Sequence, residues 1–117
     1  MKKCSNKDVK YYVDSKELFV ANNIFSSTIS SEKGDFYVIY SYGWHFPMYA
    51  FNYKTNTWFV NKDKYSVTTS KHQTQAKTSD ILALESAEGG QFAHDNKVYA
   101  YNVDTTTKMN ELIGNRG

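Results

Sequence analysis

The chain is poor in several residue types, and each shortage limits what the protein can do. Cys4 is the only cysteine, so no disulfide can form within the chain. The three histidines, His45, His72 and His94, lie far apart, and no Cys/His spacing typical of a zinc site can be written. We therefore expect no metal and no cofactor, and a reducing compartment.

Arginine and long apolar runs are also scarce. Arg116 is the only arginine, which nearly excludes recognition of phosphate or guanine by bidentate arginine contacts. The net charge of +2 is too weak to indicate a nucleic-acid partner by itself. The lysine-rich start leads into no apolar stretch, and no run approaches the roughly 20 apolar residues that cross a bilayer. We expect a cytoplasmic protein without a membrane partner.

Aromatic residues are abundant instead. Ten tyrosines, seven phenylalanines and two tryptophans make up 16% of the chain. Such residues favour strands, and tyrosine also suits protein interfaces because it combines a rigid ring with a polar tip. Composition alone does not separate a use in the core from a use on the surface.

The length and the pattern together predict one α+β domain over residues 1–117. Aromatic and β-branched runs predict strands, and the turn-prone "NYKTNTW" predicts a hairpin. Helix caps and Gly stops predict two helices, the second with Met109, Leu112 and Ile113 facing inward and Gly114 as its stop. We expect a small antiparallel sheet of four to five strands with one to three helices packed on one face. The expected strands lie in 35–42, 47–53, 57–61 and 95–104, and the expected helices in 79–90 and 105–114.

Two other regions have weaker patterns. Residues 1–10 are polar and are expected to be frayed or to form a first edge strand. In residues 11–29, the apolar runs at Tyr12–Val13, 18–20 and 24–25 could supply two short strands, with turns at 14–15 and 22–23. The alternative is a short helix over Ser15–Asn22. Residues 61–79 are polar and could hold a short helix that begins near Ser66 to Ser70.

The segment "YSYGWHFPMY", residues 40–49, is the first candidate site. Alternation along "FYVIYSY" places Tyr37 and Ile39 on one face of a strand and Phe36, Val38 and Tyr40 on the other. Gly43 permits a tight turn, and Pro47 holds the preceding residue extended. The segment then forms either a docking or stacking platform or a plain hairpin corner in the core. The candidate contact residues are Tyr42, Trp44, His45, Phe46 and Tyr49, here called the aromatic corner.

The segment "KYSVTTSKH", residues 64–72, is the second candidate. It concentrates hydroxyl groups, two lysines and a histidine, and hydroxyls near a helix start with nearby cations suit a phosphate or a carboxylate. The alternative is a capped turn whose Ser and Thr side chains bind their own backbone. The candidate anion-binding residues are Lys64, Tyr65, Ser66, Thr68, Thr69, Ser70, Lys71 and His72.

Catalytic motifs are missing from the sequence. No G-x-S-x-G, phosphate-binding loop or H-E-x-x-H can be found, and Gly89-Gly90 is better explained as a helix stop than as a phosphate cradle. We therefore expect no catalytic residue and no enzyme. A weaker hypothesis keeps His72 as the base of an enzyme that acts on a small phosphorylated or nucleotide substrate.

The two candidate segments together resemble a known set of proteins. The order of a "YSYG" strand, a hairpin Trp and "KYSVTTSKH" is similar to that of an uncharacterised family of small phage and mobile-element proteins, over residues 35–75. The resemblance implies a bacteriophage or plasmid accessory gene in a low-GC host, which the Lys- and Asn-rich composition also suits. It implies no activity.

Two functional hypotheses follow from these features. In the first, the protein acts in the host bacterial cytoplasm by binding a host protein or protein–nucleic-acid complex, as an inhibitor of a host defence system of the anti-CRISPR kind. In the second, it binds nucleic acid by stacking bases on the aromatic sheet, with phosphate contacts from Lys62, Lys64, Lys71 and Lys77. Unpaired sheet edges could also join two copies as a homodimer.

Overall fold

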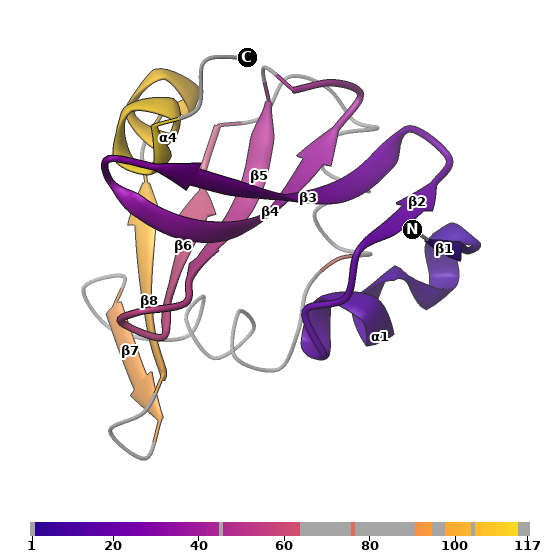
Figure 1. Ribbon diagram of the computed structural model, residues 1–117, viewed down its shortest axis with the longest axis horizontal. Coiled ribbons are helices and arrows are strands. Elements are labelled where there is room, and N and C mark those ends of the chain that lie inside the picture. The colour runs from indigo at the N-terminus through magenta and orange to yellow at the C-terminus, as the bar shows by residue number, and fades with distance from the viewer. Residues whose placement is uncertain are drawn as a thin grey trace.

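A curved mixed sheet is the framework of the molecule (Figure 1). The computed structural model describes residues 2–44, 46–63, 76, 91–94, 98–103 and 105–114. These include eight strands in the order β1-β2-β3-β4-β5-β6-β8-β7, and six of them are four residues or longer. The strands are β1 (Lys2–Lys3), β2 (Phe19–Ala21), β3 (Ile24–Ser31), β4 (Gly34–Ser41), β5 (Pro47–Asn52), β6 (Thr57–Asn61), β7 (Gln91–His94) and β8 (Val98–Val103).

The strand directions differ from those expected. The strands from β2 to β6 are antiparallel to their neighbours, but β1 pairs with β2 and β6 with β8 in parallel. A parallel pair requires a long connection, which here is the stretch from residue 62 to residue 97. The α+β class is confirmed, whereas the antiparallel sheet of four to five strands was wrong in strand number and direction.

β4 lies in the centre of the sheet and is buried on both faces. Tyr37 and Ile39 belong to one core cluster, and Phe36, Val38 and Tyr40 belong to a second cluster on the opposite face. This is the predicted alternation of side chains along a strand. Both faces are apolar, so each needs a cover.

Two described helices supply cover on opposite faces. α1 (Val9–Asp14) packs Val9 and Val13 into the cluster of Tyr37 and Ile39. α4 (Thr106–Ile113) packs Met109 and Ile113 into the cluster of Phe36, Val38 and Tyr40. The expectation that the helices pack on one face was therefore wrong. The helices pack on both faces because both faces of β4 are apolar, and one layer of helices cannot bury both.

The N-terminal region is ordered from Lys2 onward. Residues 2–3 form an edge strand, which was one of the two expectations for this region. They are followed by η1 (Asn6–Asp8), which leads into α1, so the expectation of a frayed end was wrong. The short strand expected at Tyr12–Val13 was also wrong, because Val9 and Val13 are four residues apart and share one face of a helix. The helix expected over Ser15–Asn22 was wrong as well, because β2 lies within it.

α1 ends in a left-handed turn at Lys16. The N–H of Lys16 donates to the Val13 carbonyl over 3.1 Å, and the N–H of Glu17 donates to the Tyr12 carbonyl over 2.8 Å, the paired bonds of a Schellman motif. Lys16 has φ of 56°, in the position that glycine usually takes. Its ammonium lies 4.4 Å from the centre of the Phe51 ring, so the cation covers a buried aromatic.

The predicted hairpin and the terminal helix are confirmed. β5 and β6 form the "NYKTNTW" hairpin, in which the Asn52 side chain accepts the N–H groups of Lys54 and Thr55. Thr105 caps α4 by accepting the Lys108 N–H over 3.2 Å, and Gly114 ends it with φ of 69°. Leu112 was predicted to face inward, but its side chain is 42% exposed.

Parts of the prediction lie outside the described residues. These are the helix expected over residues 79–90 and, apart from Asn61–Asp63 and Ala76, the polar stretch 61–79. β7 was not predicted at all. None of the helices seen in the described part of the chain is long and apolar enough to cross a membrane.

Candidate functional site

The aromatic corner is a tight connection between β4 and β5. The Ser41 N–H donates to the Phe46 carbonyl over 3.1 Å, and the Phe46 N–H donates to the Gly43 carbonyl over 3.2 Å. The register of the β4–β5 pair shifts at Ile39/Tyr40, so the strand is bulged as it enters the corner. Backbone hydrogen bonds therefore hold the described residues on either side of His45.

Tyr42 has a strained backbone within this corner. Its φ is 66°, in the left-handed region that side chains other than glycine rarely adopt. Its N–H donates over 2.8 Å to the carbonyl of Asn23, which is itself left-handed with φ of 59°. The hydrogen bond joins two turns at the same end of the sheet. Non-glycine residues in such conformations persist only where the surroundings hold them, and they cluster at functional sites.

The structure divides the predicted corner residues into two groups. Tyr42 and Trp44 are 54% and 53% exposed, whereas Phe46 and Tyr49 are each 1% exposed and belong to the core cluster beneath α1. His45 lies outside the described residues. The corner thus has an outward pair of aromatic side chains and an inward pair.

Trp44 rests on two other rings. Its ring centre is 5.0 Å from that of Phe25 and 5.0 Å from that of Tyr40, and Phe25 and Tyr40 stack with centres 5.1 Å apart. We call Phe25, Tyr40 and Trp44 the ring triangle. Val20, which is 37% exposed, pairs with Phe25 across β2 and β3 and so extends the apolar surface beyond the triangle.

Sequence reasoning missed Val20 and Phe25 as part of this surface. Both lie in short apolar runs, and it is strand register that pairs Val20 with Phe25 and Phe25 with Tyr40, beside Trp44. The alternation in "LFV" could have indicated that Val20 and the buried Phe19 point to opposite faces. No local signal indicated that Phe25 would lie against Trp44.

Tyr40 and Tyr37 are two buried tyrosines in the same strand with different surroundings. The Tyr37 hydroxyl donates to the Glu17 carbonyl over 2.6 Å. The Tyr40 hydroxyl is buried and has no hydrogen-bond partner among the residues that the structure describes. Burial raises the pKa of both hydroxyls well above the ordinary value, because the charged phenolate would lose its hydration. Both side chains therefore stay neutral.

The second candidate segment, residues 64–72, lies outside the described residues, but its flank is well defined. Asp63 Oδ2 accepts the N–H and the Oγ1–H of Thr106 over 3.2 Å and 3.0 Å, at the start of α4. The buried Asn61 amide donates to the Pro47 carbonyl over 2.9 Å and to Thr106 Oγ1 over 3.1 Å. This network fixes the residue directly before Lys64. Ala76, beyond the segment, is buried in the α1-side core.

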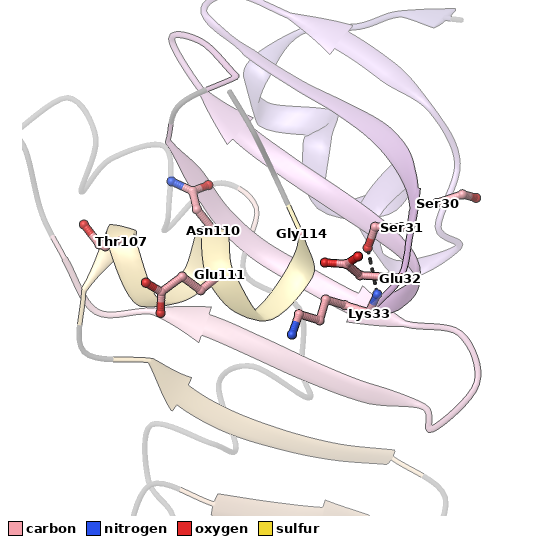
Figure 2. A pocket seen from close by; sticks show the side chains of 8 residues that line it. All are labelled: Ser30, Ser31, Glu32, Lys33, Thr107, Asn110, Glu111 and Gly114. Carbon is pink, nitrogen blue, oxygen red and sulfur yellow. Dashed lines mark hydrogen bonds between the residues drawn. The ribbon is translucent and has the colours of Figure 1, made fainter.

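A groove lies between the β3–β4 turn and α4 (Figure 2). Its volume is about 840 Å³. The Ser31 hydroxyl donates to the Ile113 carbonyl over 3.0 Å and accepts the Lys33 N–H over 3.1 Å, so it ties the turn to the end of α4. The lining carries charges of both signs and therefore indicates no particular ligand. The lining residues are Ser30, Ser31, Glu32, Lys33, Thr107, Asn110, Glu111 and Gly114.

Metal-binding side chains do not gather in the described part of the chain. No cluster of three or more His, Cys, Asp or Glu side chains suitable for a metal occurs among those residues. Burial, and to a lesser extent the Asp8 carboxylate, raises the pKa of the Cys4 thiol. A raised pKa lowers the thiolate fraction near neutral pH and makes the thiol less reactive.

Comparisons with known proteins identify no relative. The chain matches no protein-family model, and no curated protein or solved structure is significantly similar to it.

Proposed function

We propose that this chain is a non-catalytic phage or plasmid accessory protein that binds a host protein through Tyr42 and Trp44. By this binding it inhibits a host defence system, as anti-CRISPR proteins do. The observation that carries the proposal is that two large aromatic side chains stand about half exposed on a corner that backbone hydrogen bonds hold on either side of His45. Tyrosine and tryptophan dominate the energetics of protein interfaces because they bury large area with little loss of side-chain entropy.

The surroundings of Trp44 also suit a docking anchor. The Trp44 ring is supported by Phe25 and Tyr40, and Phe25 in turn pairs with Val20, so a partner would meet a continuous apolar surface. The bulged entry and the strained Tyr42 backbone support the same reading, because strain is retained where a side chain must be aimed.

A pull-down from a low-GC bacterial host lysate, with and without nuclease, tests the proposal. The baits are the wild-type chain, Trp44→Ala, Tyr42→Gly and the control Tyr11→Ala, which removes a side chain that is 63% exposed on α1. We expect the wild type and the control to retain one host protein in stoichiometric amount after nuclease treatment. Both corner variants should lose it while remaining folded by circular dichroism.

Other outcomes would contradict the proposal in distinguishable ways. Loss of all captured proteins after nuclease would favour nucleic-acid binding, in which bases stack on the same rings and affinity falls steeply as salt rises. Equal capture by all four baits would place the interface elsewhere. Capture of nothing by the wild type would reject the proposal.

The inhibitory role has a separate readout. Expression of the wild-type chain should restore phage plating on a strain that carries the defence system to which the captured protein belongs. Trp44→Ala should fail to restore plating, and Tyr11→Ala should restore it. Plating that is equally low with and without the wild-type chain would leave a binding protein that does not inhibit defence.

A further inference from the structure

The buried hydroxyl of Tyr40 is the starting point. Tyr40 is 0% exposed, and its hydroxyl is the buried side-chain atom without a hydrogen-bond partner among the described residues. An unpaired buried hydroxyl is unfavourable because it gives up its hydrogen bonds to water and gains none in return. Tyr37, three residues earlier in β4, is equally buried but donates to a carbonyl. The unpaired group therefore calls for an explanation.

The position of Tyr40 beside the aromatic corner suggests an explanation for its unpaired hydroxyl. The Tyr40 ring adjoins Trp44, one of the two half-exposed side chains at the corner, with ring centres 5.0 Å apart. Trp44 is the most exposed member of the ring triangle and lies in the short turn between β4 and β5. Because the two rings are in contact, a partner that turned the Trp44 side chain outward would gain access to the Tyr40 ring.

We propose that the Tyr40 hydroxyl is a specificity-determining contact, which donates a hydrogen bond to a neutral acceptor, such as a backbone carbonyl, on the host protein that docks at the corner. This inference rests on the proposed function. The acceptor is neutral because the rings of Phe25 and Trp44 make the surroundings apolar, and a charge there would lose its hydration. The hydroxyl acts as donor because burial keeps it protonated. A site built to hydrogen-bond one partner rejects partners that lack the matching group.

Tyr40→Phe separates this contact from a packing role because it removes one oxygen and keeps the ring. In the free protein it should raise the melting temperature by roughly 4 °C, since it removes an unpaired buried group. For the host protein captured by the wild-type chain and then purified, it should raise the dissociation constant about tenfold. The variant should thus be more stable and bind more weakly.

Tyr37→Phe is the matched control. It should lower the melting temperature, because the Glu17 carbonyl loses the shorter of its two hydrogen bonds and keeps only the one from the Ser26 hydroxyl, and leave the dissociation constant unchanged. If Tyr40→Phe raises stability but binds like the wild type, the hydroxyl is a packing defect and the inference is wrong. A lower melting temperature for Tyr40→Phe would also overturn it, because the hydroxyl would then have a partner in the free protein.

The two proposals can fail separately. If Trp44→Ala and Tyr42→Gly abolish binding and Tyr40→Phe does not, the docking function stands and this contact is rejected. If Trp44→Ala and Tyr42→Gly bind like the wild type, or the wild type captures no host protein, both proposals are rejected.

Discussion

Tyr42 allows a sharp test of whether the corner is held under backbone strain. Tyr42→Gly and Tyr42→Ala both remove the aromatic side chain, so the difference between them reports on the backbone alone. In an ordinary strand glycine is less stable than alanine by roughly 0.5–1 kcal/mol. At φ of 66° the order should reverse. Alanine would bear the left-handed cost of about 1–2 kcal/mol, and glycine bears almost none.

The expected size of the reversal follows from two opposing terms. The strain relieved by glycine is partly offset by the greater entropy of glycine in the unfolded chain, about 0.4–1 kcal/mol. We expect the free energy of unfolding of Tyr42→Gly to exceed that of Tyr42→Ala by about 0.5–1 kcal/mol. Urea denaturation with a common slope for both variants would resolve this difference.

Thr28 provides the matched control for this measurement. It is exposed in the middle of β3, and its φ is not positive. Thr28→Gly should be less stable than Thr28→Ala, in the usual order. If glycine is the less stable variant at Tyr42 as well, the corner is not strained. The argument that strain aims the Tyr42 side chain would then be refuted, whatever the binding data show.

Three further predictions concern stability. Gly114→Ala should lower the free energy of unfolding by about 2–3 kcal/mol, because φ is 69° and a Cβ there would lie 2.5 Å from Ser31 Oγ and 2.8 Å from Ser31 Cβ; urea denaturation measures this loss. Lys16→Met keeps a long unbranched side chain on the same left-handed backbone but removes the cation over the buried ring, so the unfolding free energy should fall by about 0.5–1 kcal/mol. Burial raises the pKa of Tyr37 and Tyr40 above 10.0, so stability should hold below about pH 10 and fall above it, as the unfolded chain releases protons that the folded chain keeps. Tyr40→Phe should make that alkaline fall shallower, and an unchanged slope would contradict the assignment.

Local patterns predicted the β5–β6 hairpin and α4 because each depends on neighbouring residues. The Asn52 turn, the Thr105 cap and the Gly114 stop are all set within a few positions of the chain. The parallel pairing of β6 with β8 could not be predicted in this way, because it joins strands separated by residues 62–97. The alternation in β4 gave the two faces correctly, but it could not say that both would be covered.

The candidate site was predicted in part for the same reason. The richness in aromatic residues located the corner, but burial separated Tyr42 and Trp44 from Phe46 and Tyr49. That division depends on how the bulge at Ile39/Tyr40 turns the chain between strands, and the sequence carries no local signal for it. Phe25 joined the site through strand register alone.

The parallel pairing of β6 with β8 also has a consequence for folding during synthesis. β3 to β6 are sequence neighbours joined by short turns, so they can assemble as soon as residue 61 is available. The partners of one face come much later, because Val103, Met109 and Ile113 cover Phe36, Val38 and Ala50. Pairing of β8 with β6 also requires closing the connection over residues 62–97, which costs conformational entropy before any hydrogen bond between the two strands forms. A growing chain therefore carries this apolar sheet face without Met109 and Ile113 until α4 has left the ribosome, and that interval is when it is most prone to aggregate.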